Sequence, residues 1–157
     1  MNDTPLPKPA RKLLTVGKVE LVALPDLGIP FVRAKVDTGA TTSALHAVRL
    51  HHFEQDGAEW VRFTVPKRTG RPAHRVEAPL VGLRKIKSSN GETQKRFVIK
   101  TPLVVGSKRF QAEVTLTNRS QMGFAMLLGR RALKSRFLVD VARSYAQGEG
   151  PTGKTEP

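Results

Sequence analysis

The 157-residue chain has no cysteine, one tryptophan and one tyrosine. Without cysteine it has neither disulfide bonds nor thiolate metal sites, so an apolar core must hold it together. No stretch approaches the roughly 18 apolar residues that a membrane-spanning helix requires. The segment Met1 to Lys12 contains three prolines and several charges but no apolar run, which argues against a secretory signal. We therefore expect a cytoplasmic protein with no membrane partner.

Acidic residues are also scarce: 13 Asp and Glu stand against 27 Lys and Arg, a formal net charge of +14. Residues 1–60 carry seven of each sign, so residues 61–157 carry the whole excess. Such asymmetry predicts an acidic partner, with a solubilising charged surface as the alternative. Nucleic acid is the weaker candidate partner, because the chain has no aromatic cluster suited to base stacking.

The length fits one domain with a sizeable core. The beginning of the chain is rich in proline and polar residues, and its end consists of glycine, proline and polar residues. Such segments cannot bury enough apolar surface to fold. We predict a disordered N-terminal tail over residues 1–15, one domain over 16–146, and a disordered C-terminal tail over 147–157.

Between the tails, short β-prone runs alternate with turn signals, and this pattern is typical of a closed or sandwiched all-β fold. Asn90-Gly91 is the strongest hairpin signal in the chain. Only residues 130–135, after Gly129, are expected to be helical. Strands are predicted at Val16–Leu24, Phe31–Val36, Ser43–Phe53, Trp60–Val65, Val76–Ile86, Arg96–Ile99, Leu103–Val105 and Phe110–Leu116.

Asp37 is the candidate for acid–base chemistry. It ends an apolar strand and is followed by Thr38 and Gly39. Gly39 permits a tight turn and close approach of another chain, and Thr38 places a hydroxyl beside the acid. A strand end, a local donor and open access suit a catalytic carboxylate. Taken alone, however, these are common turn residues.

A second segment strengthens the case. Met126-Leu127-Leu128-Gly129-Arg130 places apolar residues directly before a glycine and a short predicted helix. Together with Asp37-Thr38-Gly39-Ala40, it resembles the retropepsin family of aspartic proteases. The resemblance implies a retropepsin-like closed β-barrel with one short helix after Gly129.

The resemblance narrows to a bacterial retropepsin-like family over roughly Val16 to Tyr145. It is carried by residues 36–47, by Leu116-Thr117-Asn118-Arg119, and by the stretch from Leu127 to Asp140. Members of that family have been labelled ATP-dependent zinc proteases and are associated with ATP-grasp enzymes that add glutamate to protein C-termini.

The resemblance implies catalysis by Asp37, Thr38 and Gly39, with Ala40 contacting substrate. The chain holds one such motif, and aspartic peptidases need two carboxylates, so it implies a homodimer. Retroviral enzymes commonly place a second acid after Asp-Thr-Gly-Ala, where this chain has Thr41. The support for Arg130 must therefore differ from theirs.

The basic excess and the association with glutamate ligases together predict a glutamate-rich or oligoglutamate substrate. Arginine suits the capture of carboxylates because its guanidinium binds them in a bidentate manner. A flap must also cover the substrate, and we favour the turn Lys67–Pro72 over the turn Ser88–Gly91. The expected substrate-binding arginines are Arg68, Arg71, Arg84, Arg96 and Arg130.

No cofactor is expected. The chain lacks a His-Glu-x-x-His zinc helix and a Gly-x-x-x-x-Gly-Lys-Ser/Thr phosphate loop. His51 and His52 are adjacent, so they would point to opposite faces of a strand. We expect His46 to serve in packing or hydrogen bonding rather than as a metal ligand.

Three other functions compete with the protease. The first is a non-catalytic module on the same fold that binds acidic tails, and the second is a nucleic-acid-binding β-barrel. The third is a serine hydrolase acting through Ser43 or Ser120, which lacks the Gly-x-Ser-x-Gly context.

Overall fold

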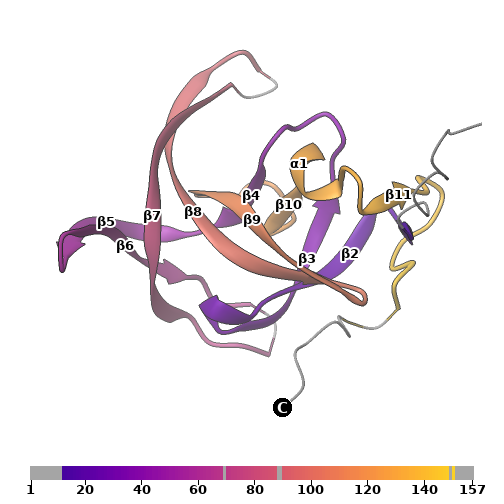
Figure 1. The fold of residues 1–157 in the computed structure, drawn as a ribbon, viewed down its shortest axis with the longest axis horizontal. Coiled ribbons are helices and arrows are strands. Elements are labelled where there is room, and N and C mark those ends of the chain that lie inside the picture. Colours follow the sequence, from indigo (N-terminus) through magenta and orange to yellow (C-terminus); the bar gives the residue numbers. More distant parts are fainter. Residues whose placement is uncertain (1–11, 69, 88–89, 149, 151–157) are drawn as a thin grey trace, which may run out of the picture.

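The computed structural model describes residues 12–68, 70–87, 90–148 and 150. Strands dominate it, with one 3-10 turn η1 (Pro25–Leu27) and one short helix α1 (Arg130–Leu133) (Figure 1). The strands are β1 (Leu14–Val16), β2 (Val19–Leu24), β3 (Ile29–Val36), β4 (Ser43–His46), β5 (Val48–Gln55), β6 (Ala58–Val65), β7 (His74–Lys87), β8 (Thr93–Val105), β9 (Lys108–Thr117), β10 (Met126–Leu128) and β11 (Phe137–Val139).

Six strands close into a barrel in the order β2-β3-β10-β4-β9-β8. The ring closes where β2 pairs with β8, with Val22 opposite Val105. Strands β7, β6 and β5 continue outward from β8. The closed all-β barrel with a short helix after Gly129 is therefore confirmed. Within the described residues, no helix is long and apolar enough to cross a membrane.

Two predicted strands, Arg96–Ile99 and Leu103–Val105, form one continuous strand through Pro102. The pairing of β7 with β8 ends at Ile99, and that of β2 with β8 begins at Val104. Pro102 thus lies where one side of β8 has no neighbouring strand. A missing N–H costs little there, so the strand continues.

The barrel core follows from the alternation of buried and exposed positions along the strands. One acidic side chain, Glu20 on β2, is buried among the apolar ones. It accepts hydrogen bonds from the backbone N–H groups of Gly17 at 2.7 Å, Ala146 at 2.9 Å and Gln147 at 3.2 Å. These bonds hold the C-terminal segment against the start of β2.

The two ends of the described fold meet at this point. Strand β1 pairs in parallel with β11, starting with Leu14 opposite Phe137. The side-chain amide of Gln147 donates to the carbonyl of Thr15 at 2.6 Å. The folded domain therefore reaches a little beyond the predicted boundaries of 16 and 146. The remainder of the predicted tails at 1–11 and 151–157 lies outside the described residues.

Replacing Glu20 with Gln is expected to destabilise the fold by about 2 kcal/mol, because an amide cannot accept all three N–H groups as a carboxylate does. Thermal and denaturant unfolding measure the change. Glu77→Gln is the matched control: Glu77 forms an exposed ion pair with Arg62 and should contribute about 0.5 kcal/mol or less. Equal stability of the two variants would contradict the assigned role of Glu20.

Candidate active site

Three adjacent strands position Asp37. β10 runs parallel to β3, with Leu128 opposite Val36, and antiparallel to β4, with Leu127 opposite Ala44. Asp37 follows directly after β3, and its N–H donates to the carbonyl of Leu128 at 2.9 Å. The end of a barrel strand therefore fixes the backbone of the candidate catalytic residue.

Gly129 brings the chain after β10 against the loop that follows Asp37. Its N–H donates to the hydroxyl of buried Ser43 at 3.1 Å. A Cβ at Gly129 would lie only 2.8 Å from the carbonyl carbon of Thr42, so only glycine fits. The next N–H, that of Arg130, donates to the carbonyl of Ala40 at 2.7 Å.

The loop itself is a tight turn around the carboxylate. The N–H of Gly39 donates to Asp37 Oδ1 at 2.9 Å, and the N–H of Ala40 donates to the Asp37 carbonyl at 3.2 Å. Asp37 is half-buried, whereas Thr38 and Gly39 are exposed. The turn therefore holds the carboxylate through the Gly39 N–H group and leaves the rest of the carboxylate accessible.

Arg130 supports this loop with neutral partners. Its guanidinium donates to the carbonyl of Thr38 at 2.8 Å and to the hydroxyl of Thr41 at 3.0 Å. Thr41 thus occupies the place where retroviral relatives commonly carry an acid, and it still accepts a hydrogen bond. The positive charge of Arg130 is held next to the turn without being neutralised.

Arg84 and Arg96 are direct cross-strand neighbours, but their side chains bind different partners. Arg84 forms an ion pair with Glu113 at 2.7 Å, and this hydrogen bond is the main reason that the pKa of Glu113 is lowered. Arg96 donates instead to the amide oxygen of Gln94 at 2.9 Å. Only Arg96 keeps an uncompensated charge.

Arg68 and Arg71 are not brought to Asp37. They face each other across a turn with reciprocal backbone hydrogen bonds of 3.0 and 2.9 Å. Arg68 lines a small cavity with Ile29 and Val32 from the first half of β3. Asp37 follows the far end of that strand, which at eight residues spans roughly 25 Å.

The same geometry corrects the preferred flap. The turn at Lys67–Pro72 lies at the η1 end of the barrel, where the His74 side chain contacts the carbonyl of Leu27 at 2.9 Å. The β7–β8 hairpin, whose turn includes Asn90-Gly91, instead arches on the side of α1 and the loop after β3 (Figure 1). The second candidate is therefore the one that lies on the side of the Asp37 loop.

Arg119 is a site residue that the sequence reasoning did not single out. It is 7% exposed, its Nε donates to the carbonyl of Phe124 at 3.1 Å, and its N–H donates to Nδ1 of His46 at 2.9 Å. Burial lowers its pKa, nearby Arg96 lowers that pKa further, and Asp37 acts in the opposite direction. The available signal was its place in Leu116-Thr117-Asn118-Arg119.

The four histidines lie on three strands, with His51 and His52 both on β5. His46 ends β4 and accepts a hydrogen bond, as predicted, while His52 contacts Glu59 in the β5–β6 hairpin and His74 begins β7. In the part of the chain that the structure describes, no three His, Asp or Glu side chains gather as a metal site.

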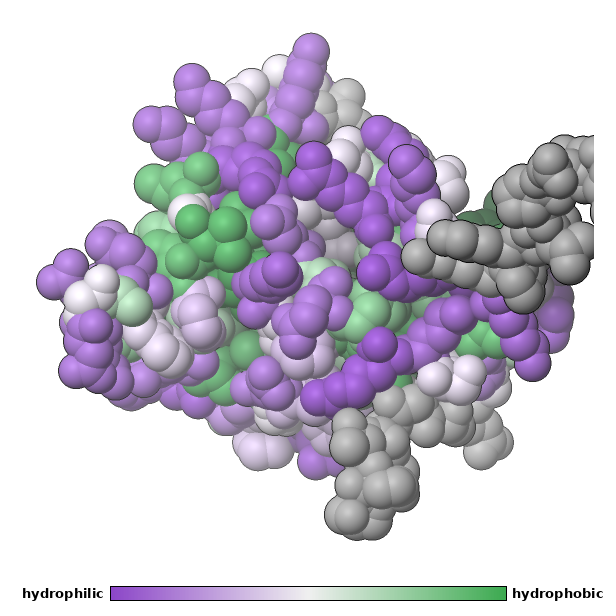
Figure 2. Space-filling view, in the orientation of Figure 1, coloured by the Kyte–Doolittle hydropathy of each residue, from purple (hydrophilic) through white to green (hydrophobic). Residues whose placement is uncertain are grey.

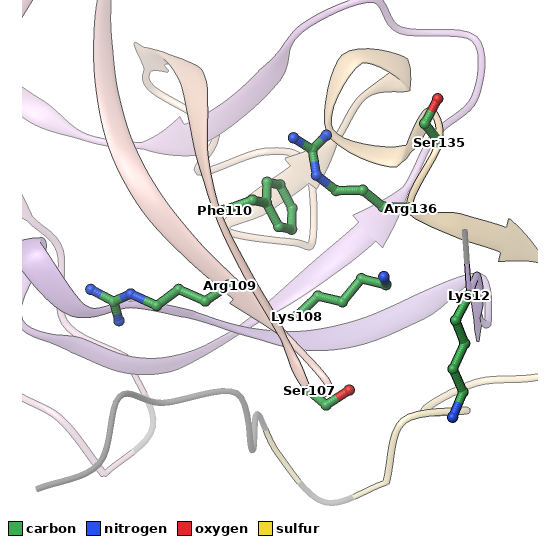
Figure 3. A pocket seen from close by; sticks show the side chains of 7 residues that line it. All are labelled: Lys12, Ser107, Lys108, Arg109, Phe110, Ser135 and Arg136. Carbon is green, nitrogen blue, oxygen red and sulfur yellow. The ribbon is translucent and has the colours of Figure 1, made fainter. Parts of the chain in front are cut away.

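A cavity of about 490 Å³ lies away from Asp37, at the turn between β8 and β9 (Figure 3). Four of its lining residues are cationic and none is acidic: Lys12, Lys108, Arg109 and Arg136. The Arg136 guanidinium lies over the ring of Phe110 at 4.2 Å. This cavity offers no acid–base pair, so the chemistry must be sought at Asp37.

Known proteins resemble this chain over most of its length. A protein from Desulfotalea psychrophila named "Probable alpha-L-glutamate ligase" is 46% identical over 136 residues, covering 85% of this chain but 29% of that protein. A protein of the same name from Shewanella pealeana is 44% identical, and the match covers 30% of its length. This chain therefore spans less than a third of these relatives.

A solved structure matches both the fold and the length. The crystal structure of a Legionella pneumophila protein of unknown function has a TM-score of 0.73 and 34% sequence identity, covering 85% of this chain and 98% of that one. A family model described as "Retropepsin-like aspartic endopeptidase RimB" matches residues 15–150. The chain thus belongs to the RimB-like family of retropepsin-like aspartic endopeptidases.

Proposed function

We propose that the protein is an aspartic endopeptidase that works as a homodimer and hydrolyses glutamate-rich or oligoglutamate chains. The observation that carries this proposal is the Asp37 carboxylate, held at a barrel strand end by Leu128 and Gly39 and open on its other side. A binding module would not need an accessible acid held in this way.

The chemistry requires two such carboxylates. Like charges in contact cannot both ionise, so the pair shares one proton and titrates as a unit. The ionised carboxylate takes a proton from water as the water oxygen bonds to the scissile carbonyl carbon, and the other gives its proton to the carbonyl oxygen. The C–N bond then breaks as the nitrogen gains a proton, which yields an acid and an amine.

The second carboxylate comes from a second copy of the chain. Each protomer supplies one Asp37, and a two-fold axis beside this residue brings two of them together. Thr38 and Gly39 are exposed next to Asp37, which suits a contact between the two loops. In this arrangement Arg130 braces each loop through Thr38 and Thr41.

The β7–β8 hairpin is the proposed flap. Two apolar side chains on β7 are exposed, Val81 at 49% and Leu83 at 60%. Figure 2 shows a hydrophobic area on the β7 side of an otherwise largely hydrophilic face. Apolar surface on a hairpin that lies on the side of the Asp37 loop suits closure over a substrate backbone and exclusion of water.

The proposed substrate follows from charge and from the relatives. Positive clefts concentrate anionic substrates, and salt screens this effect. Arg130 bonds to the Asp37 loop, and Arg119 interacts electrostatically with Asp37 and with Arg96. None of the three forms an ion pair with a described carboxylate. Two relatives that contain a region similar to this chain are named "Probable alpha-L-glutamate ligase", which supports a glutamate-containing substrate.

Replacing Asp37 with Asn is expected to lower peptidase activity by a factor on the order of 10³, because the shared proton is lost. The fold should survive, since an amide oxygen still accepts the N–H of Gly39. Peptide-cleavage assays and thermal unfolding measure the two effects. Asp26→Asn, on η1 at the other end of the barrel, is the matched control. Full activity in folded Asp37→Asn protein would refute the assignment.

Specific activity is expected to fall on dilution below the dissociation constant of the dimer, because a monomer holds one carboxylate. Cleavage rates across a protein dilution series, paired with sedimentation at the same concentrations, measure this. A protein that is monomeric and fully active at every concentration would contradict the proposed dimer.

Oligoglutamate is expected to be cleaved with a higher kcat/KM than neutral or basic peptides of equal length. This preference should shrink as salt rises, since exposed charges are screened beyond roughly 10 Å at 0.1 M ionic strength. A salt series with the three peptides measures it. If the neutral peptide is cleaved equally well, the proposed peptidase activity holds but the proposed preference for an acidic substrate is refuted.

A further inference from the structure

Arg96 lies on β8, and Arg119 follows β9, the strand that pairs with β8. Phe97 of β8 lies opposite Leu116 of β9. Arg96 directly precedes Phe97, and Arg119 follows the end of β9. The charges of Arg96 and Asp37 both reach Arg119. Arg119 is thus within electrostatic range of both Arg96 and the half-buried Asp37.

Both arginines are oriented by neutral oxygens. The Nε of Arg96 donates to the amide oxygen of Gln94, which also accepts the hydroxyl of Thr117 at 3.2 Å. The Nε of Arg119 donates to a backbone carbonyl, that of Phe124. In each case the contact fixes the guanidinium through its Nε and leaves the positive charge uncompensated.

Burying such a charge is costly unless a partner satisfies it. Arg119 is more than nine-tenths buried, yet no described carboxylate lies within ion-pair distance of it. Arg84 shows the alternative on the same sheet, since it is neutralised by Glu113. Among the described residues Arg119 thus has no ion-pair partner, and its charge is available to an anion from outside the chain.

We propose that Arg96 and Arg119 form a carboxylate-binding pair that holds an acidic group of the substrate next to Asp37, with Gln94 as the positioning residue for Arg96. The inference rests on the proposed function for the identity of the substrate. The carboxylate comes either from a glutamate side chain or from the C-terminus of the peptide. Planar guanidinium groups bind either one in the same bidentate manner.

The test measures binding rather than turnover. The full chain carrying Asp37→Asn is titrated with oligoglutamate by calorimetry, and Arg96→Gln and Arg119→Gln are added singly in this background. Each is expected to weaken binding by about tenfold to a hundredfold, the range for a lost hydrogen bond to a charged group. Arg75→Gln, an exposed position opposite Thr64, makes the same charge change away from the site and should alter affinity by about twofold or less.

The Gln94→Glu substitution tests the charge of Arg96 without removing the hydrogen bond that orients its side chain. The new carboxylate still accepts from Arg96 and Thr117, so the melting temperature should hold while the charge of Arg96 becomes neutralised internally. Binding of oligoglutamate is therefore expected to fall as it does in Arg96→Gln. If Arg119→Gln fails to fold, Arg96→Gln and Gln94→Glu carry the test, because Gln94 is exposed and Arg96 is only half-buried.

Two peptides identify the source of the carboxylate. Oligoglutamate with an amidated C-terminus keeps its affinity if side chains are bound, and oligoglutamine with a free C-terminus keeps it if the terminal group is bound. Affinity unchanged in both arginine variants, or reduced equally in Arg75→Gln, would overturn the inference. Arginine-dependent binding without cleavage by the unmodified protein would support the pair and refute the peptidase. Cleavage without arginine-dependent binding would support the peptidase and refute the arginine pair.

Discussion

The close approach of Gly129 to the backbone of Ala40 and Thr42 is the constraint on which the site depends. It permits the chain after β10 to pass directly beside the loop that follows β3. The carbonyl of Leu128 then holds Asp37 from one side, and Arg130 turns back onto the loop from the other. A larger residue at this single position would displace all of these contacts together.

The arginines near the barrel's active-site side fall into two groups, which differ in whether their partners are charged or neutral. Arg84 and, at 3.7 Å, Arg131 are paired with Glu113 and stabilise the sheet beneath α1. Arg96, Arg119 and Arg130 are held by amide, carbonyl and hydroxyl oxygens instead. A neutral acceptor orients a guanidinium without neutralising it, so the second group still contributes to the field around Asp37.

Local patterns in the sequence were enough to predict an all-β chain, the short helix and the turn at Asp37, because each depends on a few adjacent residues. The closed barrel was predicted from the family resemblance, since the pattern alone also fitted a sandwich. The continuation of β8 through Pro102 depends instead on where β2 and β7 stop pairing with it. The arginines show the same limit. Arg119 bonds to His46 and Phe124, and Arg68 faces the first half of β3, and neither position can be read from residue type or local charge.

The bonds of Glu20 and Gln147 have a consequence for domain architecture. The chain begins its fold at β1 and leaves it at Gln147, one hydrogen bond away from Thr15. A domain whose ends lie together can be fused to a larger protein through short linkers, with its barrel undisturbed. The region matched by this chain makes up 29% and 30% of two relatives, so such a unit occurs within longer proteins. Both connections would leave from the β1–β11 edge, which lies on a different side of the barrel from the β7–β8 hairpin (Figure 1), so a fused neighbour need not cover that hairpin.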